Sequence, residues 1–232
     1  MAGAWAALDW LGGSPYAPYL SHAPVEGGGR VGWFVAGWVL MSVAMMLPTA
    51  WPLVSAVHTM TRGSAGLLAV LVTGYLGVWA LFGLAAVAGD GVLHGLVATT
   101  PALAARADLL PAALLLAAGL FQFSPLKYAC LTACRSPVGF VIQHWRGRTR
   151  AARALRLGVR HGLYCVGCCW ALMLLMFAAG GVHLGWMLAL AALMSVEKAA
   201  SRGRRVTAPA GVILALWGLG LLARVPGVPA PF

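Results

Sequence analysis

The chain has 232 residues, of which 61% are hydrophobic and only 9% are charged, whereas soluble domains carry about 25% charged residues. A formal net charge of +11, from 16 Lys and Arg against 5 Asp and Glu, would suggest nucleic-acid binding in a soluble protein. Here the charges border apolar runs and no nucleic-acid-binding motif is present. The composition therefore excludes a nucleic-acid partner and favours a lipid bilayer with an anionic surface.

Long apolar runs joined by short polar connections predict an all-α, polytopic transmembrane bundle. A helix needs about 20 mostly apolar residues to cross the hydrocarbon core, and strands are disfavoured because the runs lack alternation. We predict an N-terminal extracytoplasmic segment (1–30), a bundle (31–223) with a basic cytoplasmic loop (138–161), and a C-terminal tail (224–232). About six spans are expected, at 31–57, 66–88, 109–124, 162–180, 182–196 and 207–223.

Basic residues predict the orientation of the spans, because cytoplasmic connections are enriched in Lys and Arg. The opposite side of the bundle holds three basic residues, Arg30, Arg106 and Arg224. Both termini are therefore expected outside, in a multi-pass protein of a bacterial cytoplasmic (inner) membrane. The connections after the first, third and fifth spans hold thirteen: Arg62, Lys127, Arg135, Arg146, Arg148, Arg150, Arg153, Arg156, Arg160, Lys198, Arg202, Arg204 and Arg205.

Two prolines predict breaks inside the apolar runs. Pro48 lies within the first span and removes a helical hydrogen bond to Ala44, so a kink is expected there. Ser124 and Pro125 have the pattern of an N-cap followed by proline at the first helical position. We therefore predict a short new helix from about Pro125 to Arg135, ended by Ser136–Pro137.

All five cysteines belong to two clusters, one on this short helix and one at the start of the fourth span. Spacings of three and four residues place the members of each cluster on one helix face. Under the predicted topology both clusters lie at the cytoplasmic end, where thiolates would suit Cu(I), Zn or an iron–sulfur cluster. The candidate ligands are Cys130, Cys134, Cys165, Cys168 and Cys169.

Other side chains are expected at the same membrane depth. Lys127 flanks the first cysteine pair and would favour the thiolate, and an acid such as Glu197 near a membrane is a functional candidate. Glu197 and its neighbour Lys198 also fit a simple interfacial ion pair. Four methionines could add thioether ligands or serve only as packing: Met45, Met46, Met173 and Met176.

These residues carry a resemblance to a known family. Met45-Met46-Leu47-Pro48, the stretches FSPLKYACLTACRSP and YCVGCCWALM, and Glu197-Lys198 are ordered as in a bacterial family of predicted metal-binding integral membrane proteins, a domain of unknown function. The resemblance covers roughly residues 33–200 and implies a metal of unspecified identity. It departs from the family where a Met-Asn pair is replaced by Val182-His183.

We therefore predict a membrane protein that binds a soft metal, Cu(I) before Zn, through its clustered cysteines, for metal handling or delivery. A metal chaperone or another membrane protein is the expected partner. The alternative is a membrane thiol–disulfide oxidoreductase that uses the CxxC formed by Cys165 and Cys168. Whether the protein is an enzyme stays open at this point.

Overall fold

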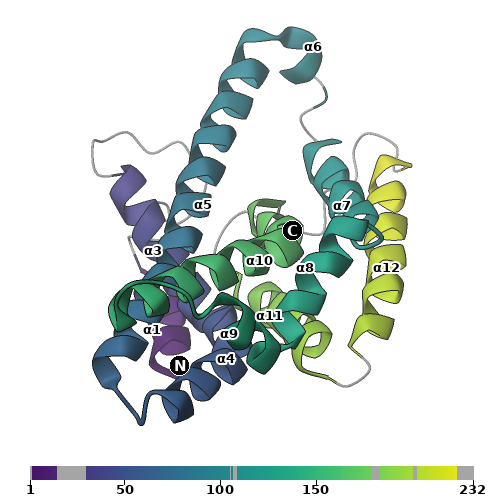
Figure 1. Cartoon of the computed structure of the whole chain (residues 1–232). Helices are drawn as coiled ribbons and strands as arrows, with labels where there is room; N and C mark the ends of the chain where they lie inside the picture. Colours follow the sequence, from purple (N-terminus) through teal and green to yellow (C-terminus); the bar gives the residue numbers. More distant parts are fainter. Residues whose placement is uncertain are drawn as a thin grey trace.

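The computed structural model describes residues 2–14, 30–104, 106, 109–178, 183–200 and 203–223, and these are helical with no strand among them. The tail predicted at 224–232 lies outside the described residues. Figure 1 shows α10 crossing the centre of the bundle, with α7 and α12 side by side at one flank and α5 extending beyond the others. The helices are α1 (Ala2–Gly12), α3 (Arg30–Met45), α4 (Leu47–Met60), α5 (Ala65–Thr99), α6 (Pro101–Ala104), α7 (Leu109–Phe121), α8 (Pro125–Arg135), α9 (Pro137–His144), α10 (Arg150–Ala178), α11 (Leu184–Ala199) and α12 (Arg204–Leu222).

Within the described part of the chain, three helices are long and apolar enough to cross a membrane: Ala65–Thr99, Arg150–Met176 and Arg205–Leu222. Two bent pairs, α3 with α4 and α7 with α8, would raise that number to five if each pair is one span. The fifth predicted span corresponds to α11, which has only 16 residues. The all-helical prediction is confirmed, while six spans and the outward termini stay predictions.

The kink predicted at Pro48 is present as a 66° bend between α3 and α4. The Met46 N–H still donates to the Ser42 carbonyl at 2.8 Å, and the Ala50 N–H donates to the Met46 carbonyl at 3.2 Å. Pro48 lies between them and has no N–H for the Ala44 carbonyl, so the helical ladder is interrupted at this point. The bend keeps Met45 and Met46 in the interior, at 1% and 0% exposure.

The break predicted at Ser124–Pro125 is also present, as a 65° bend between α7 and α8. Ser124 is the N-cap of α8, and its hydroxyl accepts a hydrogen bond from the Lys127 N–H at 3.0 Å. Pro125 occupies the first turn, and α8 ends at Arg135 as predicted. The cap and the proline together start a new helix in a new direction.

Several boundaries differ from those expected. The predicted basic loop at 138–161 is largely helical, because it contains α9 and the first turns of α10. The fourth span was expected to begin at residue 162, but α10 runs without a break from Arg150. Its basic segment is therefore the start of a long helix and not part of a loop. The N-terminal helix α1, for which the sequence showed no signal, buries Leu8 in the core.

Candidate metal centre

Three of the five cysteines lie on one buried face of α10. Cys165, Cys168 and Cys169 are each no more than 1% exposed. The Cys168 and Cys169 sulfurs are 3.4 Å apart, and the Cys168 thiol donates to the Cys165 carbonyl at 3.2 Å. The spacing of three and four residues produces this grouping, because such positions lie over successive turns of a helix.

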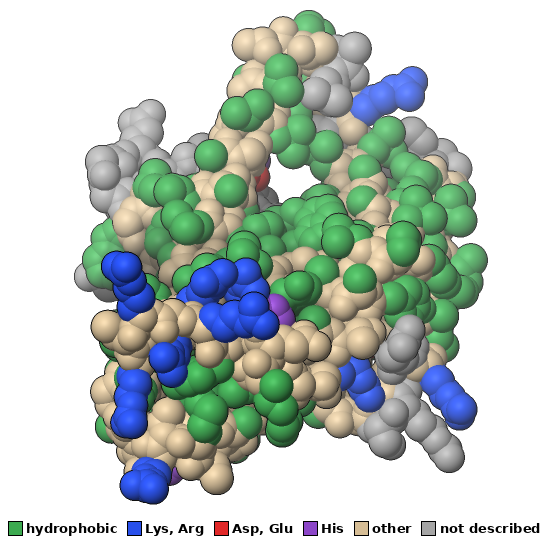
Figure 2. All heavy atoms as spheres, in the orientation of Figure 1, with side chains coloured by type: hydrophobic (Ala, Val, Ile, Leu, Met, Phe, Trp, Pro, Cys, Tyr) green, Lys and Arg blue, Asp and Glu red, His purple; other side chains and the backbone are tan. Residues whose placement is uncertain are grey.

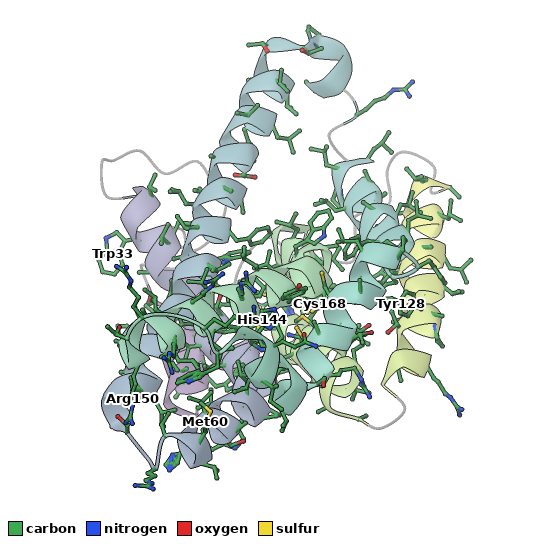
Figure 3. All side chains as sticks on the ribbon, in the orientation of Figure 1. Trp33, Met60, Tyr128, His144, Arg150 and Cys168 are labelled. Atoms are coloured by element: carbon green, nitrogen blue, oxygen red, sulfur yellow. The ribbon has the colours of Figure 1, made fainter. Side chains whose placement is uncertain are left out.

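The short helix α8 brings the other two cysteines against α10. Cys134 is partly buried and packs against the core cluster that contains Cys168, so a thiol of α8 lies against the cysteine face of α10. Cys130 lies against Gly167, where an added β-carbon would be 2.6 Å from its sulfur. The missing side chain at Gly167 therefore lets α8 approach the cysteine face of α10. Figure 3 labels Cys168 in the middle of the bundle, between the two helices.

Lys198 of α11 contacts the same cluster from the other side. Its ammonium group donates to the Cys165 sulfur at 2.9 Å and to the Thr49 hydroxyl at 3.1 Å, and it lies 3.8 Å from the Met46 sulfur. The Tyr75 hydroxyl is 3.0 Å from the Cys165 sulfur. A buried ammonium group at this distance stabilises a thiolate by direct charge attraction. The sequence had suggested only an interfacial partner of Glu197 at position 198.

Glu197 instead pairs with Lys127 of α8. The Lys127 Nζ and Glu197 Oε2 atoms are 2.8 Å apart, and their side chains are 0% and 1% exposed. Arg135, at the other end of α8, donates to the Ala200 carbonyl at 2.7 Å and also to the Glu197 carbonyl. Two basic side chains of α8 therefore attach it to the end of α11. The interfacial interpretation of Glu197 is wrong, because its carboxylate is buried and its partner is 70 residues away.

The candidate methionines belong to the same core as the cysteines. Met45, Met46, Met173 and Met176 are at most 5% exposed and lie in one cluster of buried side chains with Cys165, Cys168 and Cys169. Met46 is the one with a measured contact to a polar group of the site, the Lys198 ammonium. His183, the residue at the departure from the family pattern, is the N-cap of α11, and its ring accepts from the Trp186 N–H at 3.3 Å.

The donors present are soft, and their surroundings carry positive charge. Among the described residues, no group of three or more His, Cys, Asp or Glu side chains has the arrangement of a preformed metal site. The Cys168 and Cys169 sulfurs nevertheless lie 3.4 Å apart, and Cys165, Cys130 and Cys134 belong to or pack against the same core cluster where α8 meets α10. Thiolates and thioethers are the ligands that select Cu(I). The donor chemistry therefore fits copper carried as a cargo.

The thiol–disulfide alternative finds no support in this geometry. Disulfide exchange requires that an attacking thiolate reach a sulfur of the partner. Cys165 is 0% exposed and Cys168 is 1% exposed, beneath α8 and α11. Neither sulfur of the CxxC is accessible from the surface.

The fold and this cluster together define an all-helical protein with a sulfur-rich, charged interior. A family model described as PpoB2, copper chaperone, matches residues 35–221, and the chain belongs to this family. This agrees with the metal-related resemblance and supports a copper-related function. No curated protein and no solved structure matches the chain.

Proposed function

We propose that this protein is a membrane-integrated copper chaperone that carries Cu(I) on the cysteines where α8 meets α10. The observation that carries the proposal is the packing of Cys134 on α8 against the buried cluster that contains Cys168 on α10. Two helices that are separated in the chain supply soft donors to one point. The Cys165 and Cys169 thiols complete the cluster, and Cys130 lies at its edge against Gly167.

The charges around the cluster favour Cu(I) over Zn. One Cu(I) held by two thiolates has one excess negative charge, and the Lys198 ammonium on Cys165 offsets it. Lys127 and Glu197 already neutralise each other. A divalent zinc ion with the same two thiolates would be neutral and would leave Lys198 uncompensated in the interior, which is costly. Met46 is a neutral thioether beside Lys198 and suits the softer ion.

The surface of the bundle supports a location in the inner membrane. Figure 2 shows Lys and Arg side chains of the described residues gathered over the start of α10, around the α4–α5 connection and at the lower right, and a basic side chain beside α6 at the other end. This asymmetry favours a cytoplasmic position for the α9–α10 end, and a soluble copper donor would approach there. Large apolar side chains that are more than half exposed suit contact with lipid: Leu81, Val92, Leu120, Ile142, Ile213 and Leu216.

Anaerobic Cu(I) titration of the purified protein against a chromophoric chelator tests the copper site. We expect tight binding by the wild-type chain and its loss in the double variant Cys134→Ser/Cys168→Ser. Cys130→Ser is the matched control, because the Cys130 sulfur faces Gly167, and it should keep binding. The proposal is wrong if the double variant binds Cu(I) as tightly as the wild type does. If Zn binds the wild-type protein with the same affinity as Cu(I), the choice of Cu(I) is contradicted.

Reporter fusions test the orientation independently of the metal. A reporter fused after Gly147, in the α9–α10 connection, should be cytoplasmic, and one fused at Phe232 should be external. Reporters on the same side would exclude the six-span topology while leaving the copper site untouched.

A further inference from the structure

A buried histidine lies one helical turn before Cys165 and has no role in the cluster described above. His161 is 3% exposed, and its Nδ1 atom has no hydrogen-bond partner within the described part of the chain. Its ring lies 5.8 Å from that of Tyr75, whose hydroxyl contacts the Cys165 sulfur, so it lies beside the cysteine cluster. Because a buried polar atom without a partner is costly, such an atom points to a ligand that occupies it at some stage.

Rings connect His161 with a second histidine nearer the surface. The centroids of His161 and Phe140 are 5.4 Å apart, and those of Phe140 and His144 are 4.3 Å apart. Tyr75, whose hydroxyl contacts Cys165, lies 5.8 Å from His161 on its other side. His144 itself is partly exposed. A series of side-chain contacts therefore leads from His144 near the surface through Phe140 to His161, and through Tyr75 to Cys165.

The hydrogen bond of His144 prepares its ring for a metal. Its Nδ1 atom is 2.9 Å from the Phe140 carbonyl oxygen. Because a carbonyl only accepts, Nδ1 carries the hydrogen and Nε2 presents a lone pair. A backbone carbonyl that fixes the tautomer in this way is the usual support of a metal-binding histidine. Figure 3 labels His144 close to α9, and Figure 2 shows a histidine side chain at the same place beside the basic patch.

We infer that His144 and His161 form the entry route by which Cu(I) reaches Cys165. The inference rests on the proposed function. An anionic Cu(I)–thiolate complex would approach the arginines at the start of α10 by charge attraction. Copper binds first to the His144 imidazole, then moves past the Phe140 ring to His161, and then passes to the Cys165 sulfur.

Each transfer is a ligand exchange. A new copper–nitrogen or copper–sulfur bond forms as the previous one breaks, copper stays Cu(I), and no electron is exchanged. Thiolate ligands of the donor leave to solvent. Any proton on the Cys165 thiol is released, as thiolate binding requires. Imidazole is a competent but weaker partner for Cu(I) than thiolate, so the order of ligands runs toward the tighter site.

The experiment compares two substitutions of His161 that differ in one donor atom. His161→Met keeps a soft ligand, whereas His161→Leu has similar size and none. Both are loaded anaerobically with Cu(I)–glutathione, and the loading rate and the final copper content are measured by stopped-flow and metal analysis. His58→Leu, on an exposed histidine of α4 that makes none of the ring contacts of the route, is the control.

We expect His161→Leu to load roughly tenfold more slowly but to the same final copper content, and His161→Met and His58→Leu to load at the wild-type rate. Equal rates for the Leu and Met variants would overturn the entry route. A lower final content in His161→Leu alone would also overturn it, because His161 would then be a permanent ligand. Failure of the proposed function has a different signature, since the wild-type chain itself would then retain no copper.

Discussion

The two halves of α10 hold their neighbours by different means. Its first half crosses α5 with backbone against backbone, because Gly158 and Gly74 have no side chains: a β-carbon at Gly158 would overlap the Leu71 carbonyl, and one at Gly74 would lie 2.8 Å from the Leu155 carbonyl. Its second half meets α8 and α11 through thiols and charged groups, such as Cys165 with Lys198. One helix therefore has a half that packs by close backbone contact and a half that packs through thiols and charged groups.

The difference indicates where function lies. Close glycine crossings gain van der Waals contact, which suits helices in an apolar environment. Buried ion pairs such as Lys127 with Glu197 are poor sources of stability, because packed apolar residues often hold two helices equally well. Charges and thiols in the second half are therefore better explained by a chemical role. Four substitutions test this contrast, from the largest expected effect to the smallest.

Removal of one member of the buried ion pair should have the largest effect. Lys127→Met leaves the Glu197 carboxylate without its 2.8 Å partner, and we expect the free energy of unfolding to fall by about 3–5 kcal/mol. The measurement is denaturant unfolding in detergent, followed by tryptophan fluorescence. The double variant Lys127→Met/Glu197→Met should recover most of the loss. A double variant as unstable as the single one would mean that the charges themselves stabilise the fold.

In the first half of α10, Gly158→Ala should disturb the crossing with α5. The new β-carbon meets the Leu71 carbonyl, which belongs to the backbone and cannot rotate away. Overpacking of this kind costs about 1–3 kcal/mol. Gly77→Ala is the control on α5, because nothing lies within 4 Å of its β-carbon, and it should be neutral or stabilising by up to about 1 kcal/mol. Equal unfolding midpoints for the two variants would contradict the close crossing.

The helix cap that starts α8 should have a smaller effect on stability. Ser124→Ala removes the acceptor of the Lys127 N–H, at a cost of about 1 kcal/mol. Because the cap helps to orient the helix that bears Cys134, Cu(I) affinity should fall as well. Ser124→Asp, which also caps, should restore both quantities in the same unfolding and titration assays. If Ser124→Ala lowers the free energy of unfolding but leaves the Cu(I) affinity unchanged, the cap stabilises α8 without positioning the copper site.

Gly167→Ala should cost least, about 1 kcal/mol or less. Its β-carbon would meet the Cys130 sulfur at 2.6 Å, which is the end of a side chain and can rotate. The same substitution in a Cys130→Ala background should be neutral, as a double-mutant cycle of unfolding free energies would show. If Gly167→Ala lowers the free energy of unfolding as much as Gly158→Ala does, the Cys130 side chain and α8 cannot move to make room for the new β-carbon. The two halves of α10 would then differ less in how they pack.

The sequence by itself determined the helical class and the local breaks. Apolar runs too long for strands predicted helices, and Pro48 and Ser124–Pro125 predicted the two bends, because a missing N–H and an N-cap act within one helical turn. The grouping of Cys165, Cys168 and Cys169 on one face follows from the helical period. Each of these features depends on residues close together in the chain.

Only the tertiary structure decided which side chains meet across helices. The sequence could not show that Glu197 pairs with Lys127, that its neighbour Lys198 contacts Cys165 33 residues away, or that His161 connects to His144 through Phe140. Adjacent residues such as 197 and 198 point about 100° apart on a helix, so their partners depend on the rotation of α11. That rotation is set by the packing of all its neighbours.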